Sequence, residues 1–282
     1  MNYLERIRKK YQILTSQEKK VADFLVSNGF NAAFLSIKKL AHEIKTSQAT
    51  VVRFSQAIGY KGFVDLQKEL KKLIQKKLSP VEGLEKMILE DSKKNLYWQI
   101  FQNDTENLKK TYNVNSSKIL RRTVNELASA RNIGFFGCRT SYAISYLLYY
   151  YLSRIRNNCE LLENLAIGRL TNYLLNMGPN DLLVCVSFPR YAQQTIDIMK
   201  CAKKRGLKTL IITDKLLSPP AQIADLVLLA ERESPTYFNS LTSAVSLVNY
   251  LAAEVSLKIR KSLDRFKAFD EMDKELLFKV MM

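Results

Sequence analysis

The hydrophobic positions of residues 1–77 recur only at helical spacing. Two of the helices that this spacing predicts are short and close together, over 37–44 and 48–58. Ser47 can cap the start of the second helix with its hydroxyl, and Gly59 ends it. Two short helices separated by a few residues have the spacing of a helix-turn-helix motif. The start of the chain is therefore predicted to be an all-α helix-turn-helix domain.

From residue 131 the pattern changes to short apolar runs that alternate with helical stretches. The runs predicted as strands cover 132–137, 160–162, 181–187, 208–214 and 226–230. The helices predicted to follow them cover 142–154, 168–176, 192–205, 219–224 and 240–261. This alternation indicates an α/β domain with a doubly wound, five-stranded parallel sheet. If the strand order is 2-1-3-4-5, ligands bind beyond the carboxyl ends of the first and third strands.

The two patterns divide the chain into four parts. A polar connector rich in Lys and Asn separates the domains, and we expect most of it to be helical. The predicted boundaries are a helix-turn-helix domain over 1–77, a helical linker over 78–118, an α/β domain over 119–262 and a C-terminal tail over 263–282.

The second short helix has one apolar and one polar face. Val51, Phe54 and Ile58 would pack on other helices, while Thr50 and Arg53 lie on another side. A hydroxyl and a guanidinium are groups with which a recognition helix contacts base edges or phosphates. The predicted DNA contacts are Ser47, Gln48, Thr50 and Arg53, flanked by Lys38, Lys39, Lys45 and Lys61 as phosphate contacts.

Charge supports this interpretation. The chain has 44 Lys and Arg against 27 Asp and Glu, and residues 1–80 carry +10 of the net charge of +17. A basic N-terminal module favours an anionic partner, although a solvated helical bundle whose lysines serve solubility is an alternative.

Cysteine spacing and hydropathy exclude several classes of protein. The four cysteines are far apart and have no histidine near them, so we expect buried thiols, no metal site and no cofactor. The start of the chain is charged, and the most apolar helical stretch, 142–152, is too short to span a bilayer. We therefore expect a cytoplasmic protein without a membrane partner.

Four stretches of the N-terminal domain resemble RpiR/MurR-type bacterial transcriptional regulators. They are Leu14-Thr-Ser-Gln-Glu-Lys-Lys-Val-Ala-Asp-Phe-Leu25, Ala33-Phe-Leu-Ser-Ile-Lys-Lys-Leu-Ala41, Ser47-Gln-Ala-Thr-Val-Val-Arg-Phe54 and Ile58-Gly-Tyr-Lys-Gly-Phe63. The resemblance covers nearly all of residues 4–76, but Lys45-Thr46 replaces the glycine and apolar residue usual in the inter-helix turn. It implies a C-terminal SIS (sugar isomerase) domain that binds phosphosugars.

Two loops of the α/β domain depart from the usual SIS pattern. Most SIS domains resemble G-x-G-x-S after the first strand and S-x-S-G-x-T after the third, where hydroxyls and amides cradle a phosphate. Here Arg139 stands at the second glycine, and Pro189, Arg190 and Ala192 replace the second serine, the glycine and the threonine. The exchange removes one amide donor and two hydroxyls but adds two arginine forks, which bind phosphate or carboxylate.

These loops predict an anion pocket that depends on side chains more than on backbone amides. Alternatively, both arginines pair with local carboxylates or cap carbonyl groups, and the pocket binds nothing. The predicted effector-binding residues are Gly137, Arg139, Thr140, Ser141, Ser187, Arg190, Thr213, Ser240, Thr242 and Ser243.

The resemblance implies a regulator of sugar metabolism genes, controlled by a phosphosugar-like effector. The first alternative is a SIS isomerase, but isomerisation needs a base and often a histidine. The only histidine, His42, lies in the helix-turn-helix, so we predict no catalytic residue and no enzyme. The second alternative is a regulator whose SIS domain only dimerises. In either regulator, a homodimer or homotetramer would match a palindromic operator in double-stranded DNA.

Overall fold

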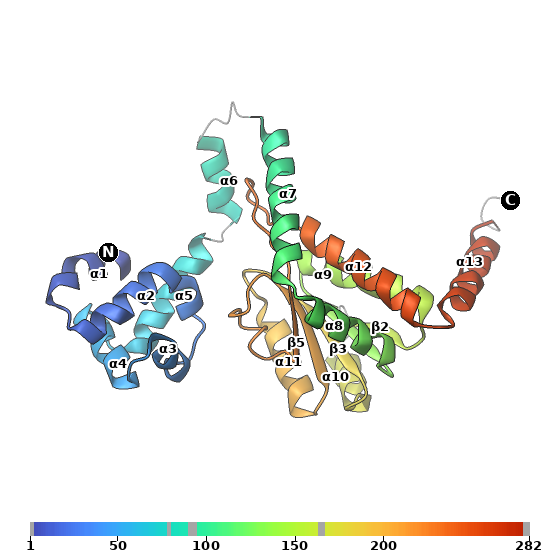
Figure 1. The fold of residues 1–282 in the computed structure, drawn as a ribbon, viewed down its shortest axis with the longest axis horizontal. Coiled ribbons are helices and arrows are strands. Elements are labelled where there is room, and N and C mark those ends of the chain that lie inside the picture. Colours follow the sequence, from blue (N-terminus) through green and yellow to red (C-terminus); the bar gives the residue numbers. More distant parts are fainter. Residues whose placement is uncertain (1–2, 78–79, 90–94, 163–166, 279–282) are drawn as a thin grey trace. The chain divides into compact units, whose positions relative to one another are not determined.

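The chain forms two compact units, Met1–Glu90 and Asp91–Met282, which we call the helical unit and the α/β unit (Figure 1). The computed structural model describes residues 3–77, 80–89, 95–162 and 167–278. Parts of the predicted linker (78–79 and 90–94) and of the predicted tail (279–282) lie outside the described residues.

The helical unit consists of helices around a small apolar core, as the helical spacing predicts. Its core includes Val21, Leu25, Leu40, Phe54 and Leu66, all of which are fully buried. The elements are α1 (Tyr3–Lys10), the 3-10 helix η1 (Tyr11–Ile13), α2 (Ser16–Ala32), α3 (Ile37–Ile44), α4 (Gln48–Ala57), α5 (Phe63–Lys77) and α6 (Pro80–Leu89).

The α/β unit alternates strands and helices after two leading helices. Those two helices are α7 (Leu96–Val114) and α8 (Ser117–Ser129). The strands are β1 (Ile133–Gly137), β2 (Cys159–Leu161), β3 (Leu182–Val186), β4 (Lys208–Thr213) and β5 (Leu226–Leu229). The remaining helices are α9 (Thr140–Ile155), α10 (Ile167–Asn176), α11 (Gln193–Lys204), α12 (Thr242–Lys258) and α13 (Ser262–Phe278).

All strands of the sheet are parallel, which confirms the predicted fold class. Their order is β2-β1-β3-β4-β5, the order for which ligands are expected beyond the ends of β1 and β3. In the β1–β3 pair, Gly137 lies opposite Val186. The last residues of the two strands are thus neighbours. Because parallel strands end at the same edge, the loops after β1 and β3 begin side by side.

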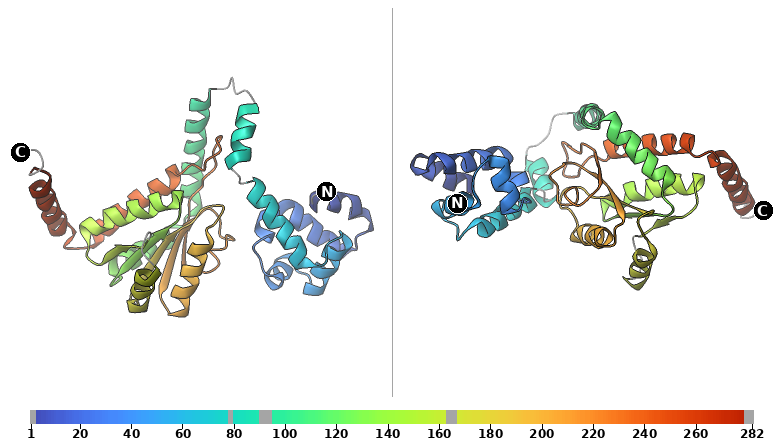
Figure 2. Two further views of the ribbon diagram at one scale, coloured as in Figure 1. Left: turned by 180° about the vertical axis from the view of Figure 1, so that it is seen from behind. Right: turned by 60° about the horizontal axis from the view of Figure 1, so that its bottom comes forward.

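Helices cover both faces of the sheet (Figure 2). On one face, side chains such as Phe135 and Val184 pack with residues of α8, α9 and α12. On the other face, their sequence neighbours Phe136 and Cys185 pack with residues of α10 and α11. Successive strand residues therefore face opposite layers, which explains why the strands read as unbroken apolar runs.

Helix α7 and the residue that follows it, Asn115, are joined to β5 and the chain after it by polar side chains at four-residue spacing. Asn115 donates through Nδ2 to the carbonyl oxygen of Leu229 (2.7 Å) and accepts from the N–H of the same residue (2.9 Å). Thr111 accepts through Oγ1 from the backbone N–H of Glu231 (2.9 Å). Asn107 donates to the carbonyl oxygen of Glu233 (2.7 Å). Part of the predicted linker thus packs on the α/β unit.

One predicted element is wrong, and two helices, α8 and α13, were not predicted. The expected helix over 219–224 is a series of turns, because adjacent prolines at 219 and 220 disfavour helical backbone at the first of them and supply no N–H. Helix α13 occupies most of the predicted tail. It is held by Arg154 of α9, which forms an ion pair with Asp273 (3.3 Å) and lies over the rings of Phe266 and Phe269.

Candidate functional site

The turn between α3 and α4 has a left-handed residue at its centre. Lys45 has φ 54° and ψ 53°, and the N–H of Thr46 donates back to the carbonyl oxygen of Ala41 (2.9 Å). This is the hydrogen-bonding pattern with which a glycine commonly ends a helix. Lys45 therefore takes the backbone conformation of the glycine it replaces, at a modest energetic cost, and its side chain is exposed.

Helix α4 presents the polar face that its sequence predicts. Val51 and Phe54 are fully buried, whereas Arg53 and Gln48 are exposed. Thr50 is half-buried. The predicted DNA contacts other than Thr50, namely Lys38, Lys39, Lys45, Ser47, Gln48, Arg53 and Lys61, are all exposed. The structure thus brings the eight predicted residues to the surface of α3, α4 and the segments that flank α4.

Two of these residues are committed to the start of α4. Ser47 accepts through Oγ from the backbone N–H of Thr50 (3.1 Å), and the two hydroxyl oxygens lie 2.9 Å apart. Capping of this kind satisfies one of the free N–H groups at a helix start. Ser47 therefore fixes the first turn of the helix that carries Arg53.

Arg6 supports the other end of α4, and local sequence patterns give no signal for it. Its guanidinium donates to the carbonyl oxygen of Gly59 (2.9 Å) and lies 4.6 Å from the ring centre of Tyr60. Gly59 has φ 91°, a conformation that glycine adopts without strain. Contacts between α1 and this turn hold the end of α4 in place.

In the α/β unit, the loops after β1 and β3 form a pocket at the carboxyl edge of the sheet, which we call the switch-point pocket. Five of the ten predicted effector-binding residues line it: Arg139, Thr140, Ser141, Ser187 and Arg190. The other lining residues are Cys138, Val186, Phe188, Pro189, Ala192, Thr195 and Asn239. The structure therefore brings the two arginine-bearing loops together.

Both arginines of the switch-point pocket have positive φ. Arg139 has φ 56° and ψ −128°, and Arg190 has φ 69°. Side chains other than glycine rarely adopt such conformations, which cost roughly 1–3 kcal/mol each. Both arginines thus have backbone conformations that glycine, the residue of the SIS pattern at these two positions, adopts without strain.

Both guanidinium groups are available for a ligand. Within the part of the chain that the structure describes, neither Arg139 nor Arg190 forms a hydrogen bond or an ion pair through its side chain. Both residues are exposed. This arrangement does not support the alternative in which the two arginines neutralise local carboxylates or cap carbonyl groups.

Gly137 is required by close packing. A Cβ atom at this position would lie 2.6 Å from the carbonyl oxygen of Ser141, which is far inside van der Waals contact. The missing side chain lets the first turn of α9 lie directly over the end of β1. Gly137 thus shapes the loop after β1, although it does not itself line the switch-point pocket.

The structure places the other four predicted effector-binding residues outside the switch-point pocket. Thr213 is buried, and its hydroxyl oxygen lies 3.2 Å from that of Ser218. Ser240 and Thr242 both donate to the carboxylate of Asp104 in α7 (2.6 and 2.7 Å). Ser243 is fully buried, so it has no access to a ligand.

A buried ion pair behind the pocket joins three strand-end loops. Asp214, after β4, accepts from the hydroxyl of Tyr191 (2.7 Å) and from Nε of Arg232 (3.3 Å). Arg232, after β5, also donates to Oδ1 of Asn239 (2.9 Å). Burial, followed by the adjacent Asp214 carboxylate, raises the pKa of Tyr191, so its phenol stays protonated. These residues position the pocket wall, and sequence spacing did not reveal them.

The chemistry of the switch-point pocket is that of anion binding. Its described lining offers two guanidinium groups, four hydroxyl groups from Thr140, Ser141, Ser187 and Thr195, and no carboxylate or histidine. Such groups neutralise and orient a phosphate or carboxylate. His42 is exposed on α3, in the other unit.

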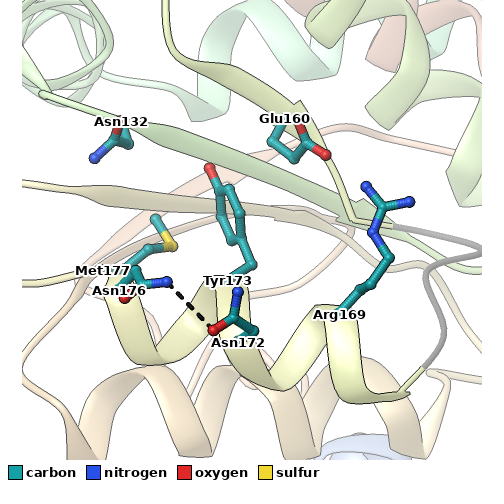
Figure 3. Close-up of a pocket in the computed structure, with 7 residues that line it drawn as sticks. All are labelled: Asn132, Glu160, Arg169, Asn172, Tyr173, Asn176 and Met177. Atoms are coloured by element: carbon teal, nitrogen blue, oxygen red, sulfur yellow. Dashed lines mark hydrogen bonds between the residues drawn. The ribbon is translucent and has the colours of Figure 1, made fainter.

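A second polar pocket lies at the opposite end of β1 (Figure 3). It is lined by Asn132, Glu160, Arg169, Asn172, Tyr173, Asn176 and Met177. Tyr173 rises from α10 toward the sheet, next to Gly134 of β1, and burial raises its pKa. The pocket contains none of the predicted site residues and lies away from the carboxyl ends of the strands.

The described residues contain no group of three or more His, Cys, Asp and Glu side chains that could hold a metal ion. None of the described helices combines the length and the apolar character needed to cross a membrane.

Comparison with known proteins gives matches for both units. Residues 1–77 match the helix-turn-helix domain of the rpiR family, and residues 126–254 match the SIS domain. The chain is also similar to the HTH-type transcriptional regulator YfhH of Escherichia coli (strain K12). The two are 33% identical over 190 residues, which is 67% of each protein.

Two solved structures share the fold. The sugar isomerase domain of an RpiR transcription factor from Sphaerobacter thermophilus is 31% identical, with a TM-score of 0.59, over 64% of this chain and 99% of that one. The Vibrio vulnificus NanR protein complexed with ManNAc-6P is 24% identical, with a TM-score of 0.69, over 98% of this chain and 99% of that one.

Proposed function

The chain belongs to the RpiR family of helix-turn-helix transcriptional regulators, and we propose that its SIS domain senses a phosphorylated sugar or a similar small anion. The chain is therefore a DNA-binding regulator, and the switch-point pocket is its effector site. Ligand binding in this pocket changes the affinity of the helix-turn-helix for an operator upstream of sugar metabolism genes. This coupling needs the effector to bind two conformations with different affinity.

One observation carries the proposal: Arg139 and Arg190, at the ends of adjacent strands, have positive φ and guanidinium groups that no other described residue engages. Strained backbone persists where the surrounding structure enforces it, and it concentrates at functional sites. Two exposed cations at one pocket repel each other unless an anion lies between them. A phosphate or carboxylate held by both forks relieves that repulsion.

The competing proposal is an isomerase, and the lining of the pocket does not favour it. Aldose–ketose isomerisation needs a general base close to the carbons that exchange a proton. The described lining supplies neither carboxylate nor histidine, and the carboxylate of Asp214 is engaged by Tyr191 and Arg232. We therefore propose a sensor without catalytic activity.

The DNA contacts follow from the surface of α4. In this proposal Arg53, Gln48 and Thr50 approach base edges, because none of them belongs to the buried face of the helix. The exposed lysines Lys38, Lys39, Lys45 and Lys61, together with Ser47 at the start of α4, contact phosphates.

Dimerisation through the α/β unit completes the proposal. Tyr146 and Tyr150 of α9 are 43% and 38% exposed, and their rings stack. Exposed tyrosine is enriched at protein interfaces. A homodimer, or a homotetramer built from two of them, presents two helix-turn-helix motifs to the half-sites of a palindrome.

The effector proposal is tested with Arg190→Ala. Wild-type protein is screened by thermal shift against glucose 6-phosphate, fructose 6-phosphate, N-acetylmannosamine 6-phosphate and their unphosphorylated sugars, because a ligand that binds only the native state raises the melting temperature. Fluorescence anisotropy then follows release of an operator selected from random duplex DNA. Loss of a charge-assisted bidentate contact should weaken ligand-dependent release by about ten- to a hundredfold.

Lys200→Ala is the matched control, because it removes one exposed cation of α11 outside the pocket. It should leave release unchanged. Unaltered release by Arg190→Ala would contradict the assignment of the pocket. Failure of every phosphorylated compound to stabilise the wild-type protein would contradict phosphosugar sensing.

A further inference from the structure

Helix α7 holds the start of α12 through a single carboxylate. Asp104 accepts through Oδ1 from the hydroxyl of Ser240 (2.6 Å) and through Oδ2 from the hydroxyl of Thr242 (2.7 Å). Asp104 precedes these two partners by 136 and 138 residues in the sequence. Both carboxylate oxygens are used, so the pair of hydroxyl groups holds Asp104 as it would hold a bound anion.

This contact lies next to the wall of the switch-point pocket, although neither Ser240 nor Thr242 lines the pocket. Ser240 directly follows Asn239, which lines the pocket, and the N–H of Ser240 donates to the carbonyl oxygen of Arg232 (3.0 Å). Arg232 is the partner of the buried Asp214. The loop between β5 and α12 is thus tied to the pocket wall through Arg232 and Asn239.

The same loop is tied to α7 on its other side. Asn107 donates to the carbonyl oxygen of Glu233 (2.7 Å), and Asn103 donates to the same oxygen. Figure 1 shows the loop rising beside α7. A displacement of the loop therefore strains or breaks its contacts with α7. Of the contacts that Asn103, Asn107 and Asp104 of α7 make with the loop and the start of α12, the one made by Asp104 involves a charged side chain.

We propose that Asp104 is an internal competitor for the anionic effector: it occupies the hydroxyl groups of Ser240 and Thr242 in the unliganded protein, and a ligand anion that takes these donors displaces it. This inference rests on the proposed function of the switch-point pocket. It explains why two hydroxyl groups that the sequence assigns to effector binding are engaged with a carboxylate. Displacement removes one of the contacts that hold α7 to the loop and leaves those of Asn103 and Asn107.

The position of α7 in the chain links displacement of Asp104 to the segment that leads to the helical unit. Helix α7 is the first described helix of the α/β unit, and its N-terminal end continues along the chain into the helical unit. Once Asp104 is displaced, the first half of α7 loses its charged contact with the loop before α12. Effector binding thereby changes the restraint on the segment that leads to the DNA-binding helices.

The test is a double-mutant cycle in the full-length protein, with fructose 6-phosphate, N-acetylmannosamine 6-phosphate and inorganic phosphate as probes. Asp104→Ala frees both hydroxyl groups, and we expect it to bind the phosphosugars about tenfold more tightly than wild type. In the Ser240→Ala/Thr242→Val background, Asp104→Ala should change the affinity little, because no donors remain to be released.

Two further variants separate competition from general electrostatics. Glu233→Gln removes a carboxylate from the same loop without freeing the hydroxyl groups and should leave affinity within about twofold of wild type. Asp104→Asn keeps the shape of the side chain and can accept one hydroxyl, so its affinity should lie between those of wild type and Asp104→Ala. It also provides a readout if Asp104→Ala folds poorly.

Hydrogen exchange supplies an independent measurement. Ligand should accelerate exchange of amides in the first half of α7 in wild type, whereas in Asp104→Ala these amides should exchange fast with or without ligand.

The inference is overturned if Asp104→Ala increases ligand affinity equally in the wild-type and Ser240→Ala/Thr242→Val backgrounds. It is also overturned if Glu233→Gln increases the affinity as much as Asp104→Ala does, or if Asp104→Ala leaves the affinity unchanged or lowers it. In those cases wild type still binds ligand, and the proposed function stands. If no probe binds wild type or Asp104→Ala, the proposed function fails and this inference fails with it.

Discussion

The strained backbone at Arg139 gives a prediction in which stability and binding change in opposite directions. Arg139→Gly removes the guanidinium and also removes the steric cost of φ 56° and ψ −128°. Arg139→Ala removes the same guanidinium but keeps a Cβ on the same backbone. The two variants therefore share the loss of ligand contact and differ in strain.

The magnitude follows from two opposing contributions. Relief of the positive-φ strain stabilises the folded state by roughly 1–3 kcal/mol. The greater freedom of glycine in the unfolded chain offsets about 0.4–1 kcal/mol of this gain. The Arg139 side chain has no hydrogen-bond partner among the described residues, so little else is lost. We expect Arg139→Gly to be about 1 kcal/mol more stable than Arg139→Ala, or about 2–4 °C in melting temperature.

The assay is calorimetric unfolding of the full-length variants, with the transition of the α/β unit identified by its shift on ligand addition to wild type. Gly206→Ala calibrates the cost of strain, because Gly206 has φ 75° and no atom lies within 4 Å of the Cβ that alanine would add. It should lose about 1 kcal/mol through strain alone. Ligand affinity should fall to the same extent in both Arg139 variants.

The result that would refute this expectation is an Arg139→Gly variant that melts at or below the temperature of Arg139→Ala while Gly206→Ala shows the expected loss. In that case the left-handed conformation at Arg139 has no free-energy cost, and it no longer supports the assignment of a functional site. Unequal ligand affinities of the two variants would show that the backbone of the loop, and not only the guanidinium, sets binding.

Two further predictions concern acid stability and DNA binding. Hydrogen bonds from Arg131 and neighbouring N–H groups lower the pKa of the buried Asp181 from 3.8 to about 2. This shift stabilises the folded state by about 2 kcal/mol above pH 3.8, and the stabilisation disappears as the pH falls through 2. The free energy of unfolding, measured in urea from pH 5 to 2, should show this loss, and in Asp181→Asn it should depend less on pH. On DNA, Lys61→Ala should weaken binding to all sequences and reduce the slope of log K against log salt by about 1. Arg53→Ala should instead relax base preference by about 1–3 kcal/mol at one position, measured by competition between operator variants; equal losses on all sequences would contradict its base contact.

Much of the fold could be predicted because its signals are local. Apolar runs of strand length, followed by helical stretches, indicated the parallel sheet. Strand order then placed Arg139 and Arg190 at adjacent strand ends, where the structure has them. Where local signals conflicted, the prediction was wrong: the 219–224 stretch reads as helical only if the cost of Pro219-Pro220 is ignored.

The tertiary partners of polar groups could not be predicted in this way. Nothing near Ser240 or Thr242 indicates Asp104, and nothing near Tyr191 indicates that Arg232 shares its acceptor, Asp214. Hydroxyl groups at a predicted helix start suit a ligand and a distant carboxylate equally well. Only the folded arrangement decides between them, because such contacts depend on the packing of elements far apart in sequence.

Asn115, which directly follows α7, binds β5 and bears on where the SIS domain begins as a folding unit. β5 is the last strand in the order of the sheet, so its outer backbone groups would be open to pairing with a strand of another molecule. Asn115 occupies the N–H and the carbonyl oxygen of Leu229 with one amide, as a sixth strand would. A fragment cut at residue 126, where the match to the SIS family starts, would uncover this edge and invite aggregation, whereas a fragment that retains α7 would keep it closed.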